Sequence, residues 1–218
     1  MSNWWVYATG FFAQGLFSAR ILVQWCMSER ARRVLSPDVF WILSLAGSIF
    51  LYLYGWMRDD FSIILGQIIS YYIYIWNLNI KGIWKRTYRP ARIAIAMLPV
   101  TAIIMMAAGG SSFVMKFLHN DDVPPYLLLF GSAGQVIFTL RFVYQWYYSY
   151  RLHVSVLPVG FWIISLIGSA IIVTYGAIRS DPVLITGQSV GLAAYIRNIM
   201  IYRQCRKEKY KRCKEPHK

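Results

Sequence analysis

Three arginines lie inside long apolar segments of the chain: Arg20, Arg141 and Arg197. A charged side chain at the centre of a membrane helix costs about 2.5–3.5 kcal/mol on insertion scales, so such residues usually face a cavity and serve a function. Every Asp and Glu falls near a segment end or in a loop, and Glu29 is the nearest of them. An interior with unpaired positive charge favours an anionic ligand, and the planar guanidinium group suits phosphate or carboxylate.

Side-chain amides accompany these arginines. Gln24 and Gln145 follow Arg20 and Arg141 by four residues, so each pair shares a helix face. The predicted substrate-binding set is completed by Glu29 and by four amides in two later segments: Gln67, Asn77, Gln188 and Asn198. We expect the amides to meet a sugar hydroxyl or a phosphate ester. Two alternatives stay open, because the arginines could extend to the nearby membrane boundary and the amides could bond between helices.

Signatures of common catalytic and metal sites are absent from the sequence. There is no HExxH, no GxSxG and no Walker loop. The cysteines, Cys26, Cys205 and Cys213, show no CxxC spacing, which argues against a disulfide framework or a zinc site. We therefore expect a protein that is not an enzyme and that has no catalytic residue, no metal and no cofactor.

The polar residues recur because the chain repeats itself. Residues 14–80 align with residues 135–201 without a gap, and many of the matches are polar, so shared hydrophobicity does not explain them. This period is too long for a solenoid unit and indicates a duplicated module of several helices. Two mismatches predict one asymmetric central site: Glu29 aligns with Tyr150, and Trp76 aligns with Arg197.

Composition and hydropathy indicate a membrane protein. The chain is 57% hydrophobic and only 15% charged, against about 25% charged in soluble domains. The net charge of +14 does not indicate a nucleic-acid partner, because the basic residues lie in loops between apolar segments. Seven segments have about the length that crosses a bilayer: 4–27, 38–57, 61–80, 92–108, 126–148, 159–178 and 182–202.

The order of these segments predicts the topology. Each copy holds three segments, and the additional fourth crossing gives the second copy the orientation of the first. The expected fold is thus an all-α integral membrane protein with seven transmembrane helices, arranged as two parallel three-helix repeats joined by a linker helix. The corresponding units are a first repeat, a linker helix with its loop, a second repeat and a basic tail: 1–90, 91–125, 126–202 and 203–218.

Local residues support the boundaries and the orientation. Pro37 and Pro158 sit where a helix accepts proline, Asp60 and Asp181 can cap the third segment of each copy, and Pro99 can kink the fourth. Most Lys and Arg fall on one side of the predicted membrane. By the positive-inside rule, the N-terminus is expected to lie outside and the basic tail in the cytoplasm.

The chain also resembles a known family. The residues that carry the resemblance are Phe17, Arg20, Gln24, Trp25, Ser28, Glu29, Pro37, Phe40, Trp41, Ser44, Gly47 and Ser48. They resemble the N-terminal domain of lipid-A-disaccharide synthase, a small membrane domain found alone or attached to bacterial envelope-glycolipid enzymes. Copy one departs from the pattern at Phe61 and Trp76, and copy two departs at Tyr150. The plan of two three-helix repeats with a linker is similar to that of SWEET and PQ-loop transporters.

These observations predict a transporter or flippase of the bacterial inner membrane. Its substrate would be an anionic lipid-linked sugar, such as a polyprenyl-phosphate sugar or a related envelope glycolipid, moved by alternating access. The expected partners are that lipid, the surrounding membrane lipids and a glycosyltransferase. Two alternatives remain: a SWEET-like carrier of a small soluble solute, and a non-transporting membrane subunit of a glycolipid-modifying enzyme.

Overall fold

The computed structural model of the 218-residue chain describes residues 4–57, 61–108, 125–178 and 182–214. These residues form eight helices, and none of them is in a strand. The prediction of an all-α fold is therefore confirmed. Asp60 and Asp181, which were expected to cap two helices, lie outside the described residues.

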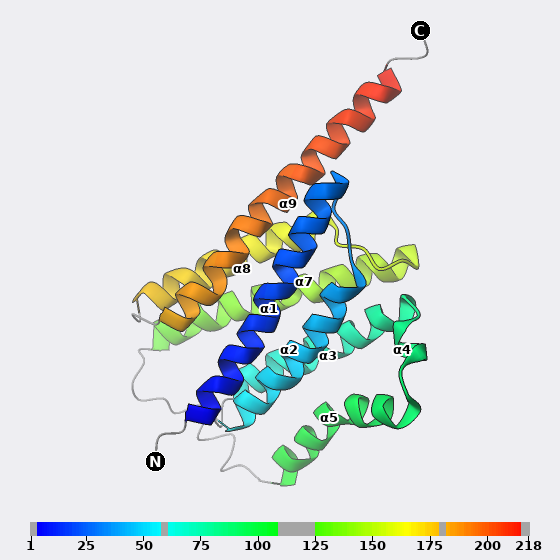
Figure 1. The fold of residues 1–218 in the computed structure, drawn as a ribbon. Coiled ribbons are helices and arrows are strands. Elements are labelled where there is room, and N and C mark those ends of the chain that lie inside the picture. The colour runs from blue at the N-terminus through cyan, green and yellow to red at the C-terminus, as the bar shows by residue number, and fades with distance from the viewer. Residues whose placement is uncertain (1–3, 58–60, 109–124, 179–181, 215–218) are drawn as a thin grey trace.

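The helices follow the order that the duplication predicts. The first repeat holds α1 (Trp4–Ala31), α2 (Asp38–Met57) and α3 (Phe61–Ile80). A short α4 (Ile83–Arg86) and α5 (Arg89–Ala108) connect it to the second repeat, which holds α7 (Pro125–Leu152), α8 (Val159–Ile178) and α9 (Pro182–Lys214). Helix α9 continues as one helix into the basic tail, as far as Lys214, and projects beyond the bundle (Figure 1).

The six helices of the repeats form a closed ring. Around it each helix contacts the next, in the order α1, α2, α3, α7, α8 and α9, and α9 returns to α1. Two lines of contact therefore join the repeats, and we call them the α1/α9 seam and the α3/α7 seam. Helix α5 lies outside the ring against α3, where the Tyr71 hydroxyl donates a hydrogen bond of 2.8 Å to the carbonyl of Ile95 (Figure 1).

The first helix of each repeat ends with the same turn. Arg32 follows α1 with φ 50°, and His153, its equivalent in the second repeat, follows α7 with φ 52°. After α1, Arg32 N–H donates to the carbonyl of Glu29 at 3.2 Å, and Arg33 N–H donates to that of Ser28 at 3.2 Å. This pair of bonds satisfies free carbonyl groups at the helix end, at the cost of a left-handed residue that is not glycine.

Proline marks the beginning of the second helix in each repeat. Pro37 and Pro158 immediately precede α2 and α8, and each accepts a hydrogen bond through its carbonyl from a nearby phenylalanine N–H at 3.2 and 3.0 Å. Pro182 is the first residue of α9, where a missing N–H costs nothing. Pro99 lies inside α5, and the kink expected there stays a prediction.

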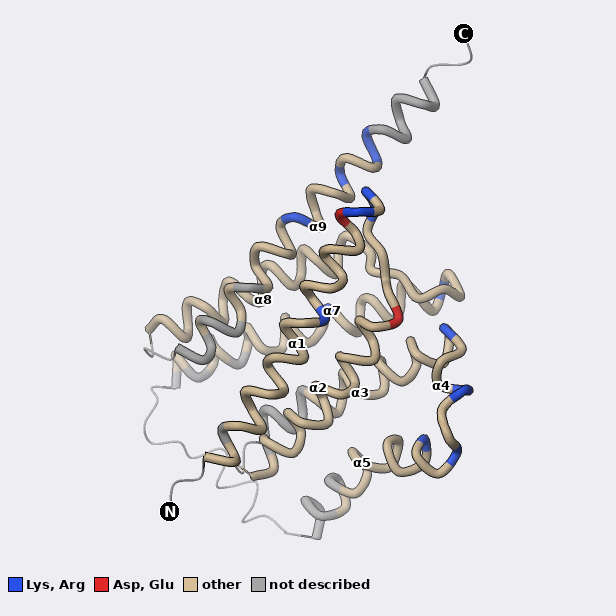
Figure 2. Tube along the Cα trace, in the orientation of Figure 1, with Lys and Arg blue, Asp and Glu red and all other residues tan. Residues whose placement is uncertain are grey.

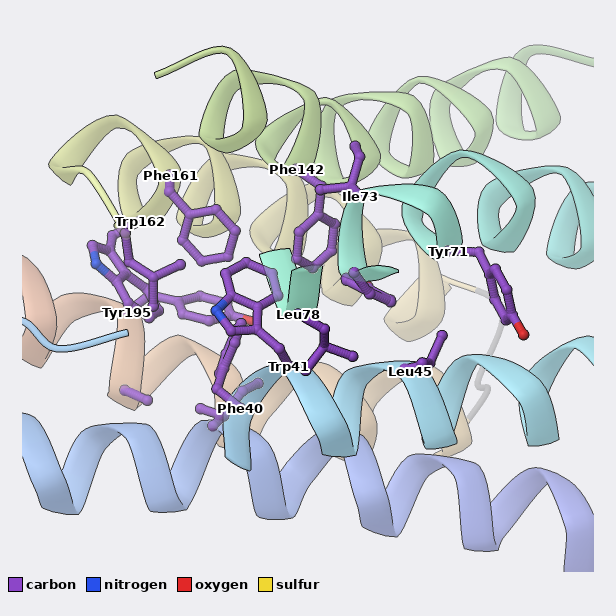
Figure 3. Packing of buried hydrophobic residues seen from close by; sticks show 14 residues of the cluster. Phe40, Trp41, Leu45, Tyr71, Ile73, Leu78, Phe142, Phe161, Trp162 and Tyr195 are labelled. Atoms are coloured by element: carbon purple, nitrogen blue, oxygen red, sulfur yellow. The ribbon is translucent and has the colours of Figure 1, made fainter. Parts of the chain in front are cut away.

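The core is aromatic and drawn from both repeats. Figure 3 shows Phe142 and Phe161 of the second repeat gathered with Trp41 of the first, all at most 2% exposed. Small residues allow close helix packing beside this cluster. At Gly168 on α8, an added Cβ would lie 2.9 Å from the Cα of Phe138 on α7, so only glycine fits without movement.

Two of the described helices are long and apolar enough to cross a membrane, namely α1 and α8, and Asp38–Tyr54 is a shorter apolar helix. The prediction of seven crossings is thus confirmed only in its helical content, and the number of crossings and their orientation stay predictions. Basic residues gather where α1 and α3 end, around α4 and along the projecting part of α9 (Figure 2).

Candidate functional site

Arg20 on α1 is buried among polar and aromatic groups. Its side chain is 5% exposed, and Nη1 donates to Ser44 Oγ at 2.8 Å and to the Tyr74 hydroxyl at 3.2 Å. The guanidinium carbon also lies 4.4 Å from the centre of the Phe17 ring, within the range of a cation–π interaction. Its Nε has no hydrogen-bond partner among the described residues. Arg20 is therefore held by neutral groups, with one N–H left free.

Arg141 on α7 is the equivalent residue, but it is less well satisfied. It is 3% exposed, and its Nε and Nη1 atoms find no partner in the described part of the chain. Ser44 and its equivalent Ser165 each donate to a phenylalanine carbonyl one turn earlier, but only Ser44 is described as also accepting a bond from its arginine. The Arg141 guanidinium lies 3.1 Å from the centre of the Phe138 ring, which provides attraction without hydrogen bonds.

Both guanidinium groups lie beside the same aromatic ring. Their carbons lie 5.4 Å (Arg20) and 4.6 Å (Arg141) from the centre of the Phe142 ring, and Figure 3 shows that ring within the aromatic core. Over the described ranges the ion pairs are Lys81–Asp38 and Arg197–Glu29, so neither central arginine pairs with a carboxylate there. Two buried cations without a counter-ion are costly, and an anion between the repeats would stabilise them.

The α1/α9 seam contains a reciprocal amide pair. Gln24 Nε2 donates to Asn198 Oδ1 at 2.9 Å, and Asn198 Nδ2 donates to Gln24 Oε1 at 3.1 Å. Both side chains have zero exposure. The alternative that these amides bond between helices is thus what the structure shows, and a contact with a substrate stays a prediction.

The α3/α7 seam contains the equivalent pair. Gln145 Nε2 donates to Asn77 Oδ1 at 3.0 Å, and Asn77 Nδ2 donates to Gln145 Oε1 at 3.1 Å. One additional bond distinguishes this seam, because Ser155 Oγ donates to Asn77 Oδ1 at 2.6 Å. Position 34, which corresponds to Ser155 in the first repeat, is a valine and cannot do the same.

The two glutamines also fix the turns that follow their helices. Gln24 Nε2 donates to Ser28 Oγ at 2.9 Å, and the N–H of Leu35 donates to the same Ser28 Oγ at 3.0 Å. In the second repeat Gln145 and Ser149 hold Val156 in the same way. Much of the duplicated polar pattern is therefore explained by buried groups that satisfy one another.

Gln67 and Gln188 each form a hydrogen bond within one repeat. Ser48 Oγ donates to Gln67 Oε1 at 2.8 Å, and Ser169 Oγ donates to Gln188 Oε1 at 2.8 Å. These bonds join the second and third helices of each repeat. Within the described residues neither glutamine forms a hydrogen bond with Arg20 or Arg141.

Arg197 differs from the other two arginines, because it has a carboxylate partner. Its Nε donates to Glu29 Oε2 at 2.8 Å, and a second bond joins its Nη2 to Glu29 Oε1. The side chains are 33% and 43% exposed. The expectation that Arg197 adds unpaired charge to the interior is therefore wrong. The reason is that α1 and α9 are neighbours, which places the end of α1 beside this turn of α9.

Aromatic residues occupy the equivalent place on the other seam. The ring centres of Trp76 and Tyr150 are 6.4 Å apart, and Trp146 stacks on Tyr150 with a centre distance of 5.7 Å. The two sequence mismatches therefore meet as pairs: Glu29 contacts Arg197 across one seam, and Tyr150 contacts Trp76 across the other. The predicted asymmetry between the copies lies at the seams between the repeats.

Three residues of the centre were not among the predicted site residues. Ser44 and Tyr74 bond Arg20, and Phe142 lies beside both guanidinium groups. Ser44 and Tyr74 recur as Ser165 and Tyr195 in the repeat, so the signal was present. Phe142 carried no such signal, since its equivalent in the first repeat is Ile21.

Comparison with known proteins supports the duplication. The family model described as "Lipid A Biosynthesis N-terminal domain" matches the chain twice, at residues 9–79 and 130–200. Lipid-A-disaccharide synthase of Chlamydia pneumoniae is 27% identical over 205 residues, covering 90% of this chain and 33% of the relative. The synthase of Chlamydia trachomatis serovar D is 30% identical over 208 residues, covering 90% of this chain and 34% of the relative. No solved structure matches the chain.

These relatives correct one expectation. The prediction that the chain is not an enzyme is overturned, because the relatives that align with nine-tenths of it carry the name of an enzyme. The chain spans about a third of the length of those relatives. With two matches that together cover most of its length, it belongs to the Lipid A Biosynthesis N-terminal domain family and carries that domain twice.

Proposed function

We propose that this chain is a membrane unit of lipid A biosynthesis that holds a phosphate-bearing glycolipid between its two repeats. The observation that carries the proposal is the pair of buried guanidinium groups of Arg20 and Arg141 around Phe142, without a described carboxylate partner. The family and the name of its relatives supply the class of ligand.

The energetics favour a phosphate at this place. A buried hydrogen-bonding group without a partner costs about 1–3 kcal/mol, and the described part of the chain leaves Arg20 Nε and two nitrogen atoms of Arg141, Nε and Nη1, in that state. Phosphate oxygens accept charge-assisted hydrogen bonds from a guanidinium group, often two at a time. One phosphate would therefore satisfy N–H groups from α1 and α7 together and neutralise part of their charge.

The unit would act together with a glycosyltransferase activity. Its relatives are named lipid-A-disaccharide synthase and are about three times as long as this chain, so the matched portion is one part of a larger enzyme there. In this proposal the chain holds the glycolipid at the bacterial inner membrane, with its N-terminus periplasmic and its basic tail cytoplasmic. A partner that carries the transferase should then co-purify with it.

Binding of a polyprenyl phosphate by the detergent-solubilised full chain tests the site, with the corresponding polyprenol as the neutral probe. Arg141→Gln and Arg20→Gln should each weaken binding of the phosphate by about tenfold or more, as expected for the loss of a hydrogen bond to a charged group. Binding of the polyprenol should not change. Arg151→Gln is the matched control, because Arg151 is exposed and lies 5.3 Å from the Tyr147 ring. Unchanged phosphate binding by folded Arg20 and Arg141 variants would refute the site.

A second candidate is transport of the same lipid by alternating access. The observation that favours it is the ring of two three-helix repeats, whose main helix contacts with each other run along two seams and which could rock against each other. Purified protein in liposomes should then move a labelled polyprenyl-phosphate sugar between leaflets. Binding without movement, together with a stable enzyme partner, would favour the first candidate. Stabilisation of the protein by a free sugar alone would instead indicate a carrier of soluble solutes.

A further inference from the structure

The proposed phosphate site is enclosed, so a ligand needs a way in. Arg20 and Arg141 are 5% and 3% exposed and lie inside a ring of six contacting helices. A lipid keeps its chains in the bilayer, so its headgroup must enter between two helices. The two seams between the repeats are the natural places for such an opening, because each repeat is itself a continuous run of packed helices.

The α3/α7 seam is closed by groups that an anion cannot displace. Trp76, Tyr150 and Trp146 pack there as aromatic rings, at centre distances between 5.7 and 6.4 Å. On the same seam, Ser155 Oγ donates to Asn77 Oδ1 and lies 3.1 Å from the hydroxyl of Ser36. The buried amide pairs are common to both seams, so the neutral rings distinguish this one, and they offer no electrostatic reason for a phosphate to open it.

The α1/α9 seam is closed at the equivalent place by an ion pair. Arg197 presents Nε and Nη2 to the carboxylate of Glu29, which is the two-point arrangement that a phosphate would also take. The pair is about a third to two-fifths exposed, and such exposed ion pairs contribute little to stability. An incoming phosphate can therefore replace the Glu29 carboxylate on Arg197 without leaving a buried cation behind.

From these contacts we infer that Arg197 is the first anion-binding residue of an entrance between α1 and α9. The Glu29 carboxylate binds the Arg197 guanidinium group until a lipid phosphate displaces it. This inference rests on the proposed phosphate site as the destination. Arg20 lies nine residues before Glu29 on α1, which corresponds to about 14 Å along the helix axis. Entry and final binding are therefore separate steps that use different arginines.

The rate of association of polyprenyl phosphate with the solubilised chain tests the entrance. Glu29→Gln removes the competing carboxylate and should raise that rate several-fold, whereas Arg197→Gln should lower it several-fold. The other seam provides a matched variant: Glu29→Tyr with Arg197→Trp copies the aromatic contact of Trp76 and Tyr150. This double variant keeps the seam packed, and thermal unfolding in detergent would check that it folds. It should associate with the lipid as slowly as Arg197→Gln or more slowly.

Three probes separate the sources of the anion and the two hypotheses. The effects should appear with polyprenyl phosphate and be absent with polyprenol, and inorganic phosphate should slow the association of the lipid. Equal effects on polyprenol, an unchanged rate in folded Glu29→Gln, or inorganic phosphate that binds as tightly as the lipid would overturn the entrance. Loss of lipid binding in Arg20→Gln or Arg141→Gln with no effect at Glu29 and Arg197 would retain the phosphate site and reject the entrance alone.

Discussion

Replacing each seam glutamine by leucine should have unequal effects, although Gln24 and Gln145 are equivalent in the two repeats. Each glutamine forms two hydrogen bonds with an asparagine across its seam, and all four side chains have zero exposure. Leucine keeps a similar size and removes those bonds. The two variants differ in the hydrogen bonds that the partner asparagine keeps after its glutamine is replaced.

The magnitude follows from the remaining partners. Hydrogen bonds between membrane helices contribute about 0.6 kcal/mol on average and about 2 kcal/mol at most, so either change should cost about 1–3 kcal/mol for two bonds. After Gln145→Leu, Asn77 Oδ1 still accepts the bond from Ser155 at 2.6 Å. After Gln24→Leu, Asn198 Oδ1 has no other described partner. A buried acceptor without a partner costs about 1–3 kcal/mol more, so Gln24→Leu is expected to be the more destabilising by that amount.

Thermal unfolding in a mild detergent measures this difference. For a chain of this size, 1 kcal/mol corresponds to about 2–4 °C in the unfolding midpoint. The variant with both Gln24→Leu and Asn198→Leu is the control, because removing both partners leaves less unsatisfied than removing one. It should unfold at a higher temperature than Gln24→Leu alone. Equal midpoints for the two single variants, or a lower midpoint for Gln145→Leu, would refute the reasoning.

Three further substitutions test the packing and the turns, each through the unfolding midpoint. His153→Gly should raise stability by up to about 1 kcal/mol, because glycine adopts the left-handed conformation seen at φ 52° without strain; a lower midpoint would contradict this. Gly168→Ala should cost about 1–3 kcal/mol, since the new Cβ would lie 2.9 Å from the Cα of Phe138, and an unchanged midpoint would show that α8 can shift freely. Ser36→Ala removes the acceptor 2.9 Å from Trp41 Nε1 and should cost about 1–3 kcal/mol, so an unchanged midpoint would contradict it.

Much of the fold could be predicted from the sequence because the duplication preserves order and spacing. The gap-free repeat predicted two equal groups of three helices, and proline placed the start of α2 and α8. The ring could not be predicted in the same way. Periodicity shows which residues share one helix face, whereas the choice of neighbouring helix depends on how complete faces pack together.

The candidate site was predicted unevenly for the same reason. Arg20 and Arg141 were recognised from charge in an apolar segment, and the structure brings them together. Arg197 was grouped with them, but its partner Glu29 lies on another helix, 168 positions away in the chain. Trp162 shows that a residue shared by both repeats can still lack the partner that its equivalent has. Its Nε1 has no described partner, because Leu157 stands where Ser36 serves Trp41 in the first repeat.

The closure of the ring has a consequence for biosynthesis. When Gln145 is synthesised, its partner Asn77 has already been made, because Asn77 lies 68 positions earlier in the chain. Gln24 must wait until Asn198, 174 positions later, leaves the ribosome. During that interval the Gln24 amide has its local bonds to Ser28 and Leu35 but lacks its partner on α9, and the membrane translocation machinery, lipid headgroups or a chaperone would have to tolerate it. The α1/α9 seam is thus the last to form, and slow or truncated synthesis should damage it first.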